Sequence, residues 1–204
     1  MEIPVMTVTR LYLIRHGQTE ENNTGVLAGS TDVPLNDHGR AQAAILRGRI
    51  NALEVNTLFS SPLQRATETA TIIFGETAPI ITDSSIQEYH FGEWEGLHFK
   101  EIEELYPDEW KMWLTDWEQT RIPGSEAFAA FKQRVTSFVD ELVTANQGQK
   151  IAIVSHGGCI RTLLAHYFCE SVKEGYWKFK VDNAALTELE FLGDMPIMVR
   201  FNYR

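Results

Sequence analysis

The chain of 204 residues lacks long apolar runs and is poor in cysteine. Its apolar runs are far shorter than the ~20 residues that span a bilayer, so we expect no membrane-spanning segment. The opening residues MEIPVMTVTR lack the charged start, apolar block and cleavage site of a secretory signal. Only Cys159 and Cys169 occur, with no CxxC pair, which argues against a secreted disulfide scaffold and favours buried free thiols. These absences predict a cytoplasmic protein.

Positive charge is also scarce, with 18 Lys and Arg against 28 Asp and Glu and a net charge of −10. This balance argues against nucleic acid or an anionic membrane as a partner. A small anionic substrate remains compatible, provided that cations gather locally. The histidines have neither H-x-x-H nor H-E-x-x-H spacing, so we expect no metal site and no cofactor. The sequence carries no signal for an oligomeric state.

The order of apolar segments indicates one α/β domain over residues 1–204, because no repeat or Pro-, Gly- or Ser-rich linker divides the chain. Predicted strands cover 10–15, 57–60, 79–82, 150–155, 185–191 and 196–202. Predicted helices cover 37–50, 61–74, 125–145 and 159–168, with N-caps at Asn36 and Ser61 and Pro62 at a first helical position. This alternation predicts three layers, α/β/α, around a mostly parallel central sheet whose last strands are antiparallel edges. Residues 92–124 hold four of the five tryptophans and predict a helical insertion.

Polar or cationic residues follow three of the predicted strands where each strand ends. Arg15 and His16 end the first strand, Arg65 begins the helix after the second, and His156 follows the buried strand KIAIVS. Ligands of open α/β sheets bind at the carboxyl ends of strands, so these side chains are candidates for one site.

Arg65 lies in the first turn of its helix, where a cation opposes the helix dipole unless an anion binds there. Gly17, Gly157 and Gly158 would let the backbone approach such an anion closely. A purely structural interpretation also exists, in which Arg65 pairs with Glu68 and the strand-end histidines only pack.

This combination of residue types suits phosphate-ester chemistry. Arginine binds phosphate in a bidentate manner, and a neutral histidine can attack phosphorus. A second histidine can donate a hydrogen bond as charge develops on the phosphoryl oxygens. The leaving alcohol needs a proton from a carboxylic acid, for which Glu88, Glu93 and Glu95 are the candidates.

The motifs that contain these residues resemble those of a known family. The segments are LYLIRHGQTEEN, TDVPLNDHGRAQA, SSPLQRATETA, IPGSEAF and VSHGGCIR. Together and in this order they resemble the histidine phosphatase superfamily, in its phosphoglycerate mutase-like branch, over essentially the whole chain. One such motif alone would be weak evidence, whereas the full set is highly specific.

The resemblance implies roles for individual residues. It implies that His16 is the phosphorylated nucleophile and that Glu88, which matches the family's E-x-x-F-G segment, is the general acid and then the general base. It implies a phosphate pocket of Arg15, Asn22, Arg65 and His156, supported by the backbone of Gly17 and Gly157, with a small-molecule phosphate ester as partner.

The features around the pocket favour a subfamily. The FGEWEG turn, the tryptophan-rich insertion and WKFKVDNAALTELEF resemble α-ribazole phosphatases, which implies hydrolysis of α-ribazole 5′-phosphate in cobalamin biosynthesis. Val26 and Ala28 depart from the arginine and the glutamine or serine that many relatives carry. A stripe of Trp110, Trp113 and Trp117 fits either packing or stacking on a substrate ring. The alternatives are a broad-specificity phosphatase, a phosphoglycerate mutase and a silent phosphate-binding module.

Overall fold

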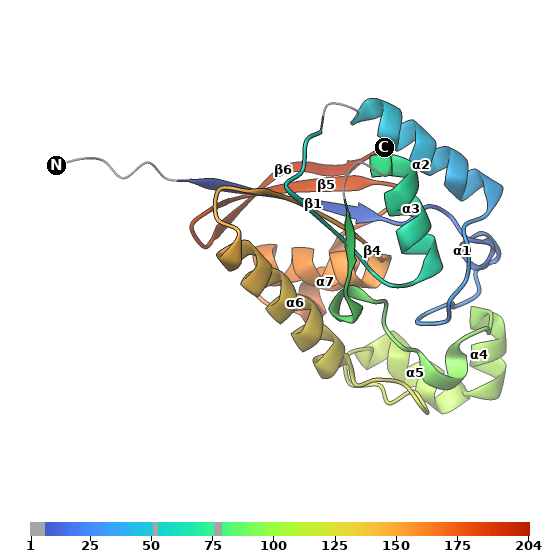
Figure 1. Ribbon diagram of the computed structural model, residues 1–204. Helices are drawn as coiled ribbons and strands as arrows, with labels where there is room; N and C mark the ends of the chain where they lie inside the picture. The colour runs from blue at the N-terminus through green and yellow to red at the C-terminus, as the bar shows by residue number, and fades with distance from the viewer. Residues whose placement is uncertain (1–6, 51–52, 76–78) are drawn as a thin grey trace.

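A six-stranded sheet forms the centre of the molecule (Figure 1). The computed structural model describes residues 7–50, 53–75 and 79–204, so most of the opening segment MEIPVMTVTR lies outside the described residues. The strands are β1 (Val8–Arg15), β2 (Thr57–Ser60), β3 (Ile80–Thr82), β4 (Lys150–Ser155), β5 (Leu186–Leu192) and β6 (Met195–Tyr203).

The strand order is β3-β2-β4-β1-β5-β6, and the first four of these strands are parallel. Strand β5 runs antiparallel to β1, and β6 antiparallel to β5. The predicted mostly parallel sheet is therefore confirmed. Only β6 of the last two strands is an edge, because β5 lies between β1 and β6.

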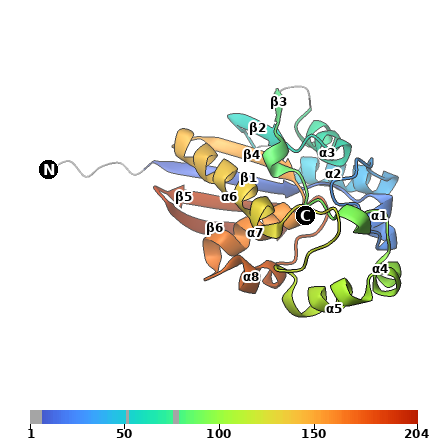
Figure 2. The same ribbon diagram turned by 90° about the horizontal axis from the view of Figure 1, so that it is seen from below.

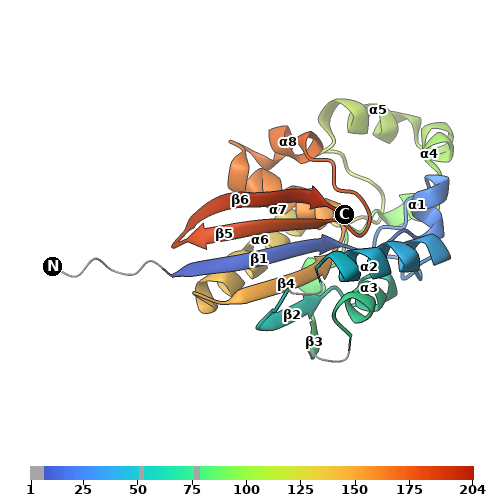
Figure 3. The ribbon, with the colours of Figure 1, turned by 90° about the horizontal axis from the view of Figure 1, so that it is seen from above.

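Helices cover both faces of the sheet, as the three-layer prediction requires (Figures 2 and 3). The helices α2 (Asp37–Arg49) and α3 (Gln64–Phe74) pack on one face, and α6 (Phe128–Ala145) and α7 (Gly157–Phe168) on the other. Alternate residues of a strand point to opposite faces, so Tyr12 and Ile14 join the core under α2 and α3. Leu11 and Leu13 join the core under α6 and α7.

The helix starts confirm one predicted cap and correct the other. The Asn36 side chain accepts a hydrogen bond from the Gly39 amide at 2.8 Å, so the predicted cap of α2 is present. The predicted Ser61 cap is wrong, because α3 begins later, with Leu63 as its N-cap residue. The Ser61 hydroxyl instead lies 2.7 Å from Nε2 of His156, a contact that the sequence does not reveal.

The insertion is helical, as predicted, and lies beyond the carboxyl ends of the strands beside α1 (Glu20–Thr24) (Figure 1). It contains η3 (Gly92–Trp94), α4 (Phe99–Leu105) and α5 (Pro107–Asp116). The Leu27 amide donates to the Leu97 carbonyl at 3.0 Å, and the Gly96 amide donates to the Leu27 carbonyl at 2.8 Å. These bonds join the loop after α1 to the insertion in a single wall.

The remaining short helices are η2 (Ser84–Ile86), α8 (Val172–Gly175) and η4 (Tyr176–Lys178). Within the described ranges, no helix has the length and apolar character to cross a membrane. The same residues contain no cluster of three or more His, Cys, Asp or Glu side chains suited to a metal ion.

Candidate active site

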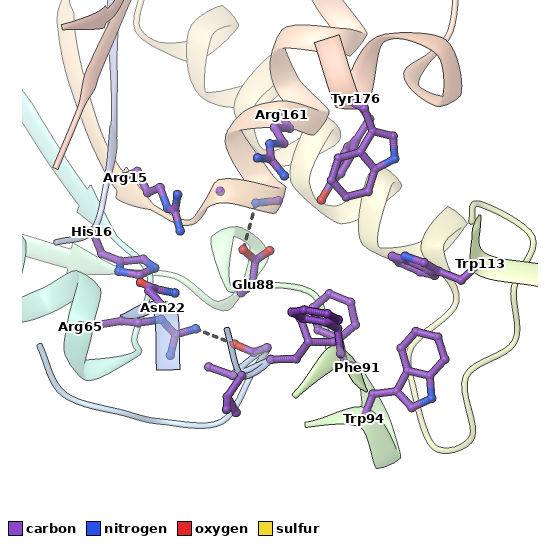
Figure 4. A pocket seen from close by; sticks show the side chains of 18 of the residues that line it. Arg15, His16, Asn22, Arg65, Glu88, Phe91, Trp94, Trp113, Arg161 and Tyr176 are labelled. Atoms are coloured by element: carbon purple, nitrogen blue, oxygen red, sulfur yellow. Dashed lines mark hydrogen bonds between the residues drawn. The ribbon is translucent and has the colours of Figure 1, made fainter. Parts of the chain in front are cut away.

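The sheet brings the predicted strand-end residues together (Figure 4). Strands β1 and β4 are parallel neighbours with Arg15 opposite Ser155, so the next residues, His16 and His156, emerge at the same edge. Their ring centroids are 5.1 Å apart. Strand β2 lies on the other side of β4, and the helix after it carries Arg65, whose Nε is 3.3 Å from His156. The site arises because parallel strands end at one edge of a sheet.

The imidazole of His16 is held in one tautomer. Its Nδ1 lies 2.6 Å from the carbonyl oxygen of Gly17, which can only accept, so Nδ1 carries the proton. The Nε2 atom then has a lone pair and no hydrogen-bond partner among the described residues. Burial, and then the positive charges of Arg65 and Arg15, hold the pKa of His16 well below its usual value. His16 is therefore neutral and presents an available nitrogen.

Arg15, which lines the same pocket as His16, has one side-chain N–H group without a hydrogen-bond acceptor in the described part of the chain. Its Nη1 donates to the Val181 carbonyl at 2.6 Å, while its buried Nε has no partner among the described residues. Burial lowers the pKa of Arg15 to about 10, against the opposing charge of Glu88. A buried donor without an acceptor costs about 1–3 kcal/mol, so this guanidinium is held at an energetic cost. Gly157 lines the pocket close to this guanidinium.

Arg65 is fixed by backbone carbonyls rather than by a carboxylate. It donates to the carbonyls of Thr31 at 2.8 Å and Gly29 at 2.5 Å. Glu68, the alternative partner, instead forms an ion pair with Arg40 at 2.6 Å. Arg65 is 2% exposed, and burial lowers its pKa despite the charge of Glu88. Its charge is therefore not neutralised by an ion pair.

His156 lies behind the pocket wall, and both of its ring nitrogens are engaged. Its Nδ1 accepts from Nε of Arg65, and its Nε2 contacts the Ser61 hydroxyl. Burial, with Arg65 next in importance, also holds the pKa of His156 well below its usual value. A hydrogen bond from His156 to a phosphoryl oxygen, as expected from the sequence, would require one of these contacts to be exchanged.

Of the three candidate glutamates, Glu88 lines the cavity. Its Oε2 accepts from the Gly158 amide at 2.9 Å, at the start of α7. Glu95 is used elsewhere, because its carboxylate accepts from the amides of Ser30, Thr31 and Phe91. Burial alone would raise the pKa of Glu95, but these hydrogen bonds, with those of the Ser30 and Thr31 hydroxyls, lower it.

Asn22 reaches the pocket from α1, and a residue outside the predicted set orients it. Its Oδ1 accepts from the side-chain amide of Asn183 at 3.0 Å, and the same amide donates to the His16 carbonyl at 3.2 Å. Asn183 thus connects the nucleophile candidate to Asn22. It lies in VDNAAL, and no local signal in that segment points to the site.

Gly17 packs closely against a neighbouring helix. A Cβ atom on Gly17 would lie 2.4 Å from the carbonyl oxygen of Gly39, in α2. A Cβ atom on Gly158 would instead lie 2.2 Å from Oε1 of Glu88, so that glycine leaves room for the carboxylate. The approach of the Gly17 backbone to an anion stays a prediction.

The far wall of the cavity, which has a volume of about 300 Å³, is largely apolar and aromatic. Val26 and Ala28 line it, so neither departure from the family pattern adds a charge to this wall. Trp110 and Trp113 also line the cavity. Trp117 is 8% exposed and packs on Phe128 and Tyr176. Of the three tryptophans, Trp117 therefore belongs to the core, whereas Trp110 and Trp113 line the cavity.

Two further residues of the wall are Arg161 and Tyr176. Arg161 lies on α7, three residues after Gly158, so the two share a helical face. That spacing within SHGGCIR is a signal from which Arg161 could have been predicted. Tyr176 is buried, and its pKa is raised by that burial and by Glu88.

The buried neutral histidines predict a dependence of stability on pH. Their pKa values are lowered in the folded state, so the unfolded chain binds more protons below about pH 6.5. We expect the free energy of unfolding to fall by about 1.4 kcal/mol per pH unit for each histidine as the pH is lowered from about 6.5. Urea unfolding at pH 7.5, 6.5 and 5.5 measures this slope, and His16→Asn should reduce it. A free energy of unfolding that is constant over this range would contradict the prediction.

The carboxyl ends of the parallel strands of this α/β protein thus bring a neutral histidine, His16, into one pocket with Arg15, Arg65 and Glu88. The chain belongs to the histidine phosphatase superfamily (branch 1), whose family model matches residues 11–204.

The similar proteins include alpha-ribazole phosphatases and a phosphoserine phosphatase. The adenosylcobalamin/alpha-ribazole phosphatase of Escherichia coli (strain K12) is 30% identical over 182 residues, 89% of each chain. The crystal structure of the alpha-ribazole phosphatase from Shigella flexneri is similar with a TM-score of 0.87 and 30% identity, covering 95% of this chain and 96% of that one. Phosphoserine phosphatase from Entamoeba histolytica, solved with 3-phosphoglyceric acid, has a TM-score of 0.85 and 30% identity, covering 96% and 98%.

Proposed function

We propose that this protein is a metal-independent phosphomonoesterase that works through a phosphohistidine, with α-ribazole 5′-phosphate as its substrate. The observation that carries the reaction is the geometry of His16. Its Nδ1 is hydrogen-bonded to Gly17, and its Nε2 is unpartnered among the described residues.

In the first step, the Nε2 lone pair of His16 attacks phosphorus and forms a P–N bond. The bond between phosphorus and the ester oxygen breaks, and its electron pair goes to the alcohol oxygen. That oxygen takes a proton from Glu88. Arg15 and Arg65 bind the phosphoryl oxygens and stabilise the charge that develops on them. Both arginines line the pocket together with His16, which supports this role.

In the second step, water attacks phosphorus while the Glu88 carboxylate takes one of its protons. The P–N bond breaks, and its electron pair returns to Nε2 of His16. Inorganic phosphate then leaves, and both catalytic groups are back in their starting state. Asn22 contributes its side-chain amide to phosphate binding, because Asn183 already occupies its Oδ1.

The apolar wall supports the choice of substrate. The pocket has one cationic corner, with Arg15 and Arg65, and an aromatic side that includes Trp110 and Trp113. A planar benzimidazole gains from stacking on such rings. The names of the relatives from Escherichia coli and Shigella flexneri point the same way.

A substrate panel tests this proposal. We expect kcat/KM for α-ribazole 5′-phosphate to exceed that for ribose 5-phosphate, which lacks the ring, by about tenfold or more, because stacking contributes about 1–3 kcal/mol per base. A Trp113→Leu variant should lower this ratio, and Leu105→Ala, at an exposed site, is the matched control. Equal values across the panel would indicate a general phosphatase. Isomerisation of 3-phosphoglycerate without phosphate release would indicate a mutase. Inactivity toward every ester would indicate a phosphate-binding module without catalytic activity.

A further inference from the structure

The segment IPGSEAF has no part in the proposed mechanism, although it is one of the motifs that resemble the family. Its Glu126 forms a two-pronged ion pair with Arg134 of α6, with N···O distances of 2.7 Å and 3.1 Å. The Arg134 and Glu126 side chains are 26% and 21% exposed. Burial of two charges costs desolvation energy, so a gain in stability is a poor explanation for the pair. Its other contacts indicate a different use.

The guanidinium of Arg134 binds the backbone of the segment that carries Glu88. Its Nη1 donates to the carbonyl oxygens of Ser85 at 3.0 Å and Gln87 at 2.7 Å, with Ser84 at 3.4 Å as a longer contact. Its Nη2 donates to the carbonyl oxygen of Glu88 itself at 3.2 Å. A guanidinium suits this arrangement, because it presents several N–H donors in fixed directions from one plane.

This segment has little regular structure of its own to hold it. Residues 87–91, between η2 and η3, form neither helix nor strand. The Ile86 carbonyl accepts from Oγ of Ser155 at 2.7 Å. Together with the carbonyls that Arg134 binds, every carbonyl from residue 84 to residue 88 therefore accepts from a side chain. The position of the segment thus depends on α6 and β4 rather than on a ladder of backbone hydrogen bonds.

Glu126 holds the backbone on the other side of Glu88. Its Oε1 accepts from the His90 amide at 2.9 Å, and its carbonyl oxygen accepts from the Tyr89 hydroxyl at 2.7 Å. Two amides direct the carboxylate of Glu88, because its Oε1 accepts from Tyr89 at 3.0 Å and its Oε2 from Gly158 at 2.9 Å. The ion pair thus fixes the chain on both sides of the proposed acid.

The proposed acid needs such support because it lies on an irregular segment. His16 directly follows strand β1, whereas Glu88 reaches the middle of the pocket from residues 87–91 (Figure 4). A general acid must come within about 2.6–3.2 Å of the oxygen that it protonates. A displacement of about 1 Å can cost about a hundredfold in rate, even when the altered residue is far from the reacting atoms. Arg134 is absent from the described lining of the pocket, so its effect on the reaction passes through other residues.

We propose that Arg134 is a positioning residue which, with Glu126 as its partner, fixes the backbone of Glu88 so that the carboxyl group meets the ester oxygen. This role gives the IPGSEAF segment a function in the reaction without contact with the substrate. The inference rests on the proposed phosphatase function and on the role of Glu88 in it.

The dependence of the rate on the leaving group tests this inference. For Arg134→Gln we expect kcat to fall by about ten- to a hundredfold with the alkyl ester that the wild type cleaves best in the substrate panel. KM should change little, because Arg15 and Arg65 are untouched. With p-nitrophenyl phosphate, the burst of p-nitrophenol should keep nearly its wild-type rate, since that leaving group departs without a proton. A loss of stability alone would lower both rates by the same factor.

Arg10→Gln is the matched control, because Arg10 forms an ion pair with Glu190 at 2.9 Å at the far end of β1. It should behave like the wild type with both substrates. Arg134→Lys keeps a charge beside Glu126 but loses the planar fork, so it should recover part of the lost rate. Adding Arg134→Gln to Glu88→Gln should cost less than about twofold with the alkyl ester, because the group that Arg134 positions is already absent.

The outcomes separate this inference from the phosphatase proposal. If urea unfolding shows that Arg134→Gln is not folded, Glu126→Gln replaces it and should show the same dependence on the leaving group with a smaller loss. Equal losses on both substrates, or a full further loss in the Glu88→Gln background, would mean that Arg134 only stabilises the fold. The inference would then be wrong, and the phosphatase function would stand. A wild type that is inactive toward p-nitrophenyl phosphate and every ester of the panel would overturn both.

Discussion

Replacing His16 by alanine is expected to reduce phosphate release by roughly four orders of magnitude or more, because the variant has no nucleophile. His156 cannot take over, since both of its ring nitrogens are already engaged. Rapid acid quench with ³²P-labelled substrate measures the effect directly. Wild-type protein should carry label that is labile in acid and stable in base, and His16→Ala should carry none.

The control for this substitution is His38→Ala, at an exposed histidine of α2. It should leave both turnover and labelling unchanged. Circular dichroism and urea unfolding would confirm that His16→Ala is folded. Wild-type protein without label in the burst phase, or a His16→Ala variant within tenfold of wild-type turnover, would exclude covalent catalysis by His16.

Replacing Glu88 by glutamine is expected to slow hydrolysis in a way that depends on the leaving group. For esters of ordinary alcohols the loss should be about 10²- to 10⁴-fold, because the alkoxide no longer receives a proton. For p-nitrophenyl phosphate the first step should lose much less, since its leaving group departs without protonation. The second step still needs Glu88, so labelled phosphohistidine should accumulate in Glu88→Gln.

Glu93→Gln is the matched control, because Glu93 is exposed and accepts from the Tyr106 hydroxyl at 2.9 Å. It should behave like the wild type with both kinds of substrate. A glutamine side chain can still accept from the Gly158 amide, so the start of α7 is preserved. Equal losses on both substrates with no accumulation of phosphohistidine would mean that Glu88 only caps that helix.

Much of the fold could be predicted from local patterns. The strands 57–60 and 150–155 have the predicted bounds, because both segments are too short for a typical helix and are flanked by turn signals. The Asn36 cap could also be predicted, because it depends on a contact with Gly39, only three residues away. The Ser61 prediction failed because α3 begins three residues later, at Gln64, and Ser61 also contacts His156, 95 residues later, which no local pattern reveals.

The sequence by itself determined the chemistry available at the strand ends. His16, Arg15, Arg65 and His156 each follow or begin a recognisable element, and parallel strands must end at a common edge. The tertiary structure decided which groups are available to react. It directs Nε2 of His16 to the pocket, engages both nitrogens of His156, and places Glu88 rather than Glu95 at the cavity. It also adds Asn183 and Arg161, which lie in quoted motifs but were not singled out as site residues. The physical reason is that orientation, burial and hydrogen-bond partners depend on contacts between distant segments, which form only when the elements pack.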